Sequence, residues 1–328
     1  MVSLPLMARL LEALRPEARL VLVGDPDQLA SVEAGAVLGD LVARPPVADA
    51  LPEALRAVVP EHLPSDEPTL ARLRNGVVRL EKVYRFEKGI AALAEAVRAG
   101  DAEATLAVLR SGADDVELVE PGGERLTEAD VAGLRADAVA AGERVVQAAR
   151  VGDGRAALAA LEAHRLLLGH RRGPAGVTHW AAEVERWVAD ATGGEPDGPW
   201  YPGRPLLVTA NDRSTGLYNG DTGVLVADGA GGVVAVFGDP DHPVRVRPHR
   251  LPPVETVHAM TVHRAQGSQF TTVSLVLPPP ESPLLTRELF YTAVTRAREK
   301  VRMVGTEAAV RAAVTRPVRR ASGLMHPR

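Results

Sequence analysis

A short apolar run that ends abruptly in polar residues constrains this chain more than any other feature. Residues 20–23 are four aliphatic residues in a row, and Gly24, Asp25 and Pro26 follow at once. Such a run, bounded by turn residues, predicts a short buried strand. Gln28 comes next, and its amide can donate to a phosphate oxygen while accepting from water. Because ligands of open α/β sheets bind outside the carboxyl ends of the strands, the segment fits a nucleotide-binding edge, with an ordinary strand-to-turn junction as the alternative.

Composition sets the class of protein. The 328 residues suffice for two or three domains, with 46% hydrophobic and 24% charged residues as in globular proteins. No apolar stretch approaches the roughly 20 residues needed to span a bilayer, and the N-terminus lacks a signal-peptide pattern. The absence of cysteine excludes disulfides, zinc–thiolate sites and cysteine nucleophiles. We therefore expect a cytoplasmic protein without a membrane partner, and its net charge of -4 means that nucleic-acid binding would need a local basic surface.

The hydrophobic pattern changes character twice along the chain. Before residue 203, the pattern predicts helices at 4–14, 35–42, 90–99 and 176–190, and strands at 20–23, 77–80 and 164–168. From 203 to 254, β runs alternate with Asn-Gly, Gly-Gly and Gly-Asp-Pro turns, which predicts a small all-β module with strands at 205–209, 222–226, 232–237 and 244–246. A strand at 273–277, a helix at 287–295 and a strand at 301–304 follow. The chain is thus predicted to be α/β, with a β insert inside a discontinuous domain.

A second polar cluster occupies residues 261–270. It contains Thr261, His263 and Gln266, and Gly267 would allow close approach to the backbone. Taken singly, most of these residues fit a polar loop that leads into the strand at 273–277.

A third cluster lies at residues 289–300. Helical spacing places Leu289, Ala293 and Arg296 on one face. An arginine delivered by an apolar helix suits a phosphoryl group, because the guanidinium is planar and permanently charged. The alternative is a solvated helix end formed by Arg296, Arg298, Glu299 and Lys300.

Together, and in this order, the three clusters resemble the motifs of superfamily 1 helicases. GDPDQL at 24–29 is similar to motif III, TVHRAQGSQF at 261–270 to motif V, and YTAVTRARE at 291–299 to motif VI. Tyr84 and Arg85 resemble motif IV. More narrowly, residues 29–41, 84–86 and 211–223 look like those of RecD-like helicases, which include the alpha subunit of exodeoxyribonuclease V. The resemblance covers most of the chain and is weakest at 102–162 and beyond 317.

The resemblance implies two RecA-like domains with ATP between them and single-stranded DNA across both. Residues 1–80 would be the C-terminal remnant of the first RecA-like domain. Residues 81–202 and 255–317 would be the two parts of the second. Residues 203–254 would form a small SH3-like all-β module that interrupts this second domain, and residues 318–328 a tail.

The resemblance also implies roles for single residues at the nucleotide. Gly24 and Asp25 would line the nucleotide cleft, and Gln28 would sense the γ-phosphate. Arg85 and Arg296 would act catalytically, as cations that stabilise the charge of phosphoryl transfer.

Other residues would contact DNA. Gln266 and Gly267 would link the nucleotide site to the DNA backbone, with Thr261 and His263 nearer the strand. Tyr218 would shape a turn, as Asn211, Asp212 and Asn219 would, or would stack on a base. Arg287 is expected to be only a solvated helix start, and Gln269 stands where relatives often carry an acid.

Two motifs of the family are absent. No GxxxxGK[ST] sequence occurs, so the backbone cradle and the lysine that hold the β- and γ-phosphates are missing. The acidic pair of motif II is missing as well, and Met1 matches the residue just after it. No metal ligands are therefore assigned.

We accordingly expect a fragment of an ATP-dependent 5′–3′ DNA helicase of double-strand-break repair and recombination. Its full-length parent would use ATP and Mg²⁺, whereas the fragment alone would bind neither tightly and would be inactive as an ATPase. Single-stranded DNA is the implied partner, with RecB- and RecC-like subunits if the parent is a subunit rather than a stand-alone helicase. The alternative is a non-catalytic DNA- or partner-binding module.

Overall fold

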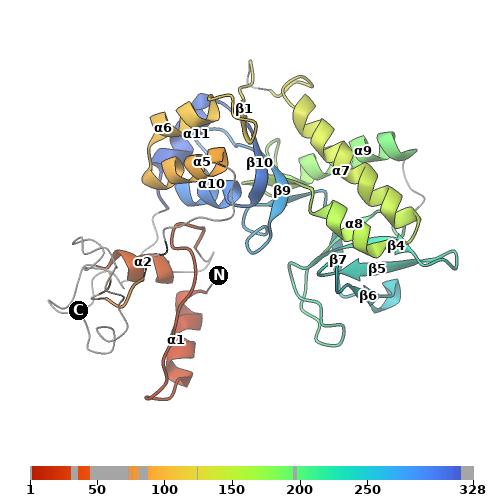
Figure 1. Ribbon diagram of the computed structural model, residues 1–328, viewed down its shortest axis with the longest axis horizontal. Coiled ribbons are helices and arrows are strands. Elements are labelled where there is room, and N and C mark those ends of the chain that lie inside the picture. Colours follow the sequence, from red (N-terminus) through yellow and green to blue (C-terminus); the bar gives the residue numbers. More distant parts are fainter. Residues whose placement is uncertain are drawn as a thin grey trace. The chain divides into compact units, whose positions relative to one another are not determined.

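The chain forms two compact units. This computed structural model describes residues 2–30, 36–44, 73, 75–78, 80, 88–123, 125–194 and 198–318. Residues 1–84 and 318–328 make up the first unit, and residues 85–317 the second. Figure 1 labels most of the helices and strands of both.

The first unit contains helices α1, Leu4–Ala13, and α2, Val37–Ala43. Ser3 caps α1, because its hydroxyl accepts the N–H of Leu6 at 3.4 Å, and Pro5 lies in the first turn. Both helices lie where the sequence predicts them.

The buried strand predicted at residues 20–23 is wrong. These residues form no strand, and Val21 and Val23 are 80% and 92% exposed. An apolar run becomes a buried strand only where other strands pair with it and a second layer covers it. No residue described in the first unit forms a strand, and this includes residues 77, 78 and 80 of the strand predicted there.

The second unit is built on a five-stranded parallel sheet in the order β1-β10-β9-β2-β8. The carboxyl-terminal halves of the central strands are buried, as expected where helices cover both faces of a sheet. This confirms the mixed α/β class with a parallel sheet. The strands are β1, Val116–Val119; β2, His164–Leu168; β8, Ala259–Thr261; β9, Phe270–Val276; and β10, Ala297–Val304.

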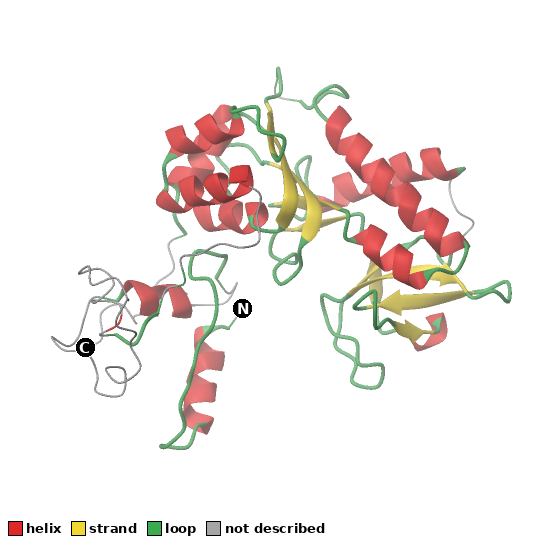
Figure 2. Ribbon diagram, viewed as in Figure 1, coloured by secondary structure: helices red, strands yellow, loops and turns green. Residues whose placement is uncertain are grey.

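Two groups of helices cover the parallel sheet (Figure 2). On one side are α5, Lys88–Ala99; α6, Ala102–Leu109; α10, Arg287–Val294; and α11, Glu307–Thr315. On the other side are α7, Ala132–Arg150, and α9, Val177–Thr192. The helices predicted at 90–99, 176–190 and 287–295 are confirmed, and Gly100 follows α5 with a φ of 74° that suits glycine.

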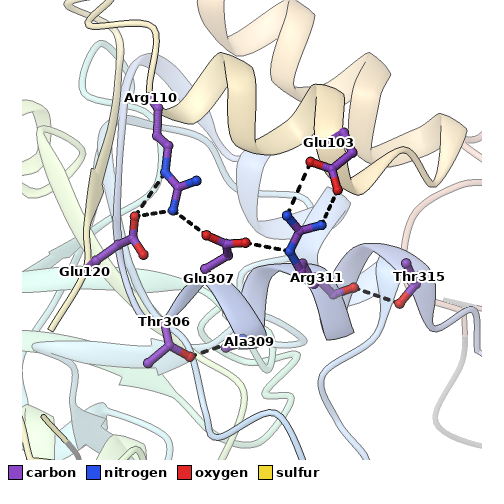
Figure 3. A network of polar contacts seen from close by, with 8 residues as sticks. All are labelled: Glu103, Arg110, Glu120, Thr306, Glu307, Ala309, Arg311 and Thr315. Carbon is purple, nitrogen blue, oxygen red and sulfur yellow. Dashed lines mark hydrogen bonds and ion pairs between the residues drawn. The ribbon is translucent and has the colours of Figure 1, made fainter. Parts of the chain in front are cut away.

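A chain of ion pairs joins α6, α11 and the end of β1 (Figure 3). Arg110 binds Glu120 at 2.5 Å and Glu307 at 2.7 Å, and Arg311 binds Glu307 at 2.7 Å and Glu103 at 2.5 Å. The hydrogen bond from Arg311 lowers the pKa of Glu103. Hydrogen bonds from Arg110 and, second, from Arg311 lower the pKa of Glu307. Because these side chains are exposed, the network orients the helices more than it stabilises them.

A separate antiparallel sheet, the β module, confirms the all-β prediction. Its order is β6-β5-β4-β3-β7, and both of its faces are packed. The strands β3, β4 and β5 each differ from the predicted range by one residue at one end, and β6 matches its predicted range. The sequence does not predict β7. The strands are β3, Pro205–Val208; β4, Thr222–Ala227; β5, Val233–Phe237; β6, Val244–Val246; and β7, Val254–Thr256, with a 3₁₀ turn, η1, at Pro248–Arg250.

The β module lies between β2 and β8 in the sequence, so segments from both sides of it build the parallel sheet. Helix α7 spans the two sheets. Its Leu134 and Ala138 pack in the core of the parallel sheet, whereas Val145 and Ala149 pack with α8, Gly154–Leu161, against the β module.

Arg165 and two half-buried histidines lie where the β module meets the parallel sheet. Arg165 is 3% exposed, and its guanidinium donates to the carbonyls of Val257 at 2.8 Å and Leu161 at 3.2 Å. Desolvation, together with the charge of Arg165, lowers the pKa of His164 to about 3 and that of His258 to about 4. Both imidazoles are therefore neutral in the folded protein at pH 7.

These histidines make stability depend on pH. In the unfolded chain a histidine has a pKa near 6.5, so below that pH the unfolded state binds protons that the folded state excludes. We expect the free energy of unfolding to fall as pH drops from about 6.5 to 5, by about 1.4 kcal/mol per pH unit for each histidine. Urea unfolding followed by tryptophan fluorescence measures this slope. His258→Phe should reduce it by about one histidine's share, and an unchanged slope in that variant would contradict the assignment.

Candidate functional site

The polar residues of the first unit form a compact turn. One carboxylate oxygen of Asp25 accepts the N–H of Asp27, and the other accepts from Nε2 of Gln28, each at 3.0 Å. The Gln28 amide is thus oriented by its neighbour. A Cβ at Gly24 would lie 2.9 Å from a terminal methyl group of Leu38 on α2, so a larger residue there would require the Leu38 side chain to shift.

In the second unit, Thr261 ends β8 and a tight turn follows. The Thr261 carbonyl accepts the N–H groups of Arg264 at 3.0 Å and Ala265 at 3.1 Å. Gly267 has a φ of 89°, a backbone conformation that favours glycine, and lies exposed on this turn. His263 and Gln266 are half-buried.

Arg296 is buried, with 6% of its surface exposed, and follows the end of α10. Its Nε donates to the Thr292 carbonyl at 3.2 Å, and Nη2 lies 3.4 Å from the Thr295 hydroxyl. Leu289 and Ala293 are buried as well, but so are Phe290, Thr292 and Val294, and α10 ends at Val294, so the predicted single helical face that includes Arg296 is wrong. The solvated helix end is wrong for Arg296, because the chain turns here into β10 instead of continuing the helix.

Two hydrogen bonds join the second and third polar clusters. Nη1 of Arg296 donates to the Ser268 carbonyl at 3.1 Å, and the N–H of Phe270 donates to the Arg296 carbonyl at 2.9 Å. Gln266 and Gly267 therefore lie within two residues of the Arg296 contact, while Thr261 and His263 lie toward the β8 end of the turn. The sequence did not predict Ser268 as a contact, because a carbonyl partner leaves no trace in residue type.

Tyr218 lies on an ordered loop between β3 and β4 and is 53% exposed. Its N–H donates to Asp221 at 2.8 Å, and the N–H of Asn219 donates to Asn211 at 2.8 Å. The carboxylate of Asp212 accepts the N–H of Ser214, which lowers the pKa of Asp212. The polar residues of the loop thus shape its turns, as expected, and they hold the Tyr218 backbone in place.

Two other arginines complete the set of sequence predictions. Arg85 lies outside the described residues. Arg287 is not merely a solvated helix start, because its Nε donates to the Val314 carbonyl at 2.8 Å near the end of α11. A cation suits the carbonyl end of a helix, and that end lies far along the chain, where sequence spacing cannot reveal the contact.

Two features are absent from the described residues. Within them no helix has the length and apolarity to cross a membrane. Nor do those residues bring together three or more histidines or carboxylates in a way that could hold a metal ion.

Models of two protein families match the parts of this chain that contain the three polar clusters. A model of the UvrD-like helicase C-terminal domain matches residues 256–304, which run from β7 to the end of β10, and a model of an AAA domain matches residues 1–76. The RecBCD enzyme subunit RecD of Mycolicibacterium smegmatis is 52% identical over 324 residues, 99% of this chain. The chain belongs to the RecD-like family of superfamily 1 helicases.

Other members are more distant, and all of those compared are longer. The RecBCD subunit RecD of Mycobacterium tuberculosis H37Rv is 51% identical over 99% of this chain, and the ATP-dependent RecD2 DNA helicase of Deinococcus radiodurans is 30% identical over 95%. This RecD-like chain spans 52%, 51% and 36% of the three relatives, so about half of the two RecD subunits. A crystal structure of Bacteroides Pif1 bound to ssDNA aligns with 69% of the chain and 51% of Pif1, at 14% identity and a TM-score of 0.39.

The contacts of Arg296 predict a structural cost for its removal. Arg296→Ala removes the donor to the Ser268 carbonyl and leaves a cavity where the buried side chain lay, so it should lower the free energy of unfolding by about 1–3 kcal/mol. Arg298→Ala is a matched control, because Arg298 is exposed and pairs with Glu162 only at 3.4 Å; it should change stability by about 0.5 kcal/mol or less. Urea denaturation measures both, and equal losses in the two variants would contradict the prediction.

Proposed function

We propose that this RecD-like chain is the part of an ATP-dependent 5′–3′ DNA helicase that carries motifs III to VI, acting in double-strand-break repair and recombination. The observation that carries the proposal is the bond between Arg296 and the Ser268 carbonyl. It joins the motif V and motif VI segments inside the span that matches the helicase C-terminal model. By the same reasoning, the parallel-sheet layer is a second RecA-like domain and the β module is its SH3-like insert.

The site residues then divide by ligand. Gly24, Asp25 and Gln28 are the proposed nucleotide contacts of the motif III segment, and the orientation of the Gln28 amide by Asp25 supports a sensing role for Gln28. Arg85 and Arg296 stabilise the charge of the transferred phosphoryl group. Gln266 and Gly267 link the nucleotide site to the DNA contacts, because they lie within two residues of Ser268, whose carbonyl binds Arg296.

Three residues are proposed as DNA contacts. Thr261 and His263 lie at the β8 end of the same turn, and Tyr218 offers an exposed ring on an ordered loop of the β module. Single-stranded DNA is the proposed ligand, because every base presents a face on which an aromatic ring can stack. Several relatives are subunits of a RecBCD enzyme, which makes RecB- and RecC-like chains the proposed protein partners.

The residues of this chain do not by themselves make a complete site for ATP and Mg²⁺. An amide and a guanidinium can contact the γ-phosphate, but the sequence offers no GxxxxGK[ST] cradle for the other phosphates. We therefore derive no hydrolytic step within this chain, and we propose that the remaining half of a full-length RecD supplies the cradle.

The first prediction concerns ATP. The purified chain, given ATP, Mg²⁺ and oligo-dT, should show no turnover above background. A chimaera with the remaining half of the Mycolicibacterium smegmatis relative should hydrolyse ATP and unwind a 5′-tailed duplex, and Arg296→Lys should remove turnover while ATP still binds. DNA-stimulated hydrolysis by the isolated chain would refute the inactive-fragment proposal. A folded chimaera that binds DNA but never turns over ATP would instead favour a non-catalytic binding module.

A second prediction concerns Tyr218. Stacking on one base is worth about 1–3 kcal/mol, so Tyr218→Ala should weaken oligo-dT binding by roughly 5- to 150-fold. Trp200→Ala is the matched control, because Trp200 is 45% exposed beside the same sheet and is covered by the guanidinium of Arg204 at 5.7 Å. Fluorescence anisotropy at fixed salt gives both affinities. Unchanged binding by the Tyr218 variant would remove this residue from the DNA site.

A further inference from the structure

Arg165 occupies an unusual place for a cation. It lies on β2, an interior strand of the parallel sheet, and is 3% exposed. On its β8 side, pairing begins only at Ala259, which lies opposite Leu166. Arg165 therefore has no β8 partner and faces the chain that arrives from the β module.

The guanidinium contacts three separate segments. It donates to the Val257 carbonyl at 2.8 Å, in the connection from β7 to β8, and to the Leu161 carbonyl at 3.2 Å, at the end of α8. It also lies over the ring of Phe270, 5.0 Å from the centroid, where β9 begins. Val257 and Phe270 are the two ends of the segment that contains Thr261, His263, Gln266 and Gly267.

Burying the charged Arg165 side chain costs free energy that an apolar side chain at this position would not. Among the described residues Arg165 forms no ion pair with a carboxylate, and its Nε has no hydrogen-bond partner. Burial lowers the pKa of Arg165 to about 10. An apolar side chain of similar length would fill the space without desolvating a charge. What only the guanidinium provides is simultaneous bonding to two carbonyls from different segments.

We propose that Arg165 is a positioning residue, a lock that ties both ends of the 257–270 segment to β2 and to the end of α8. The two ends of the segment would then be held or released together. The mechanical inference stands on these contacts alone. Its meaning for DNA and nucleotide binding rests on the proposed function, because the segment carries the proposed DNA contacts and its Ser268 carbonyl holds Arg296.

Hydrogen exchange of the intact chain tests the lock without any ligand. Three protected amides report on the segment: Val257, bonded to the Pro205 carbonyl; Val262, bonded to that of Leu168; and Phe270, bonded to that of Arg296. In Arg165→Met we expect these three to exchange about tenfold faster than the fall in global stability explains, the equivalent of one charged hydrogen bond. Arg165→Lys, which keeps the charge but not the fork, should give a smaller selective effect.

Arg302→Met is the matched control. Arg302 is as buried as Arg165, at 6%, and lies on β10, but it bonds Glu117 and Asp137 and not the segment. It should accelerate exchange of the three reporters no more than that of α5 amides such as Leu93. A uniform acceleration in Arg165→Met, as in the control, would overturn the proposal.

A wild-type measurement decides the matter if the variants do not fold. Under increasing denaturant, Val257, Val262 and Phe270 should open together, with one common free energy and denaturant dependence. Three independent openings would overturn the lock. If the exchange results are as expected but Arg165→Met binds oligo-dT as the wild type does, the lock holds and the proposed DNA role of the segment fails.

Discussion

The register of β9 against β10 is the constraint on which the candidate site depends. Phe270 pairs with Ala297 where both strands begin, so the residues just before each strand must meet at the same edge of the sheet. Arg296 directly precedes β10 and Ser268 lies two residues before β9, so the pairing brings them close enough for the hydrogen bond from the Arg296 side chain to the Ser268 carbonyl. The pairing of β9 with β10 shifts its register between Ala297 and Lys300, so the irregularity lies at the start of β10. The rest of the pairing is regular.

Elements with a strong local signal could be predicted from the sequence. The strands at 164–168 and 244–246 match because each is a compact run bounded by turn or polar residues. β7 and β8 were not predicted, because each has three residues and too short a run to show a period. Residues 20–23 have the strongest strand signal of the first unit and are exposed coil, because burial depends on neighbouring strands that a local run does not specify.

The sequence predicted which residues belong to the candidate site better than it predicted which atoms they contact. Spacing grouped Leu289, Ala293 and Arg296, and all three are buried, although α10 ends before Arg296 and is buried on more than one side. The partners of Arg296 and Arg287, however, are main-chain carbonyls 28 and 27 residues away. Every residue type has a carbonyl, so no sequence pattern marks these partners; only the fold selects them. The same limit hid Arg165, whose partners are also carbonyls.

Two different links fix the β module to the parallel sheet, and both help to hold the candidate site in place. Helix α7 buries one half of its length in each core, so the module cannot rotate on the sheet without opening one of them. The 257–258 connection, held at Arg165, is the second link. Two of the proposed DNA contacts then follow buried anchors directly: Tyr218 follows Leu217, which is 2% exposed, and His263 follows Val262, which is fully buried. Each side chain is presented from a backbone already fixed in place, so little conformational entropy is lost when it binds.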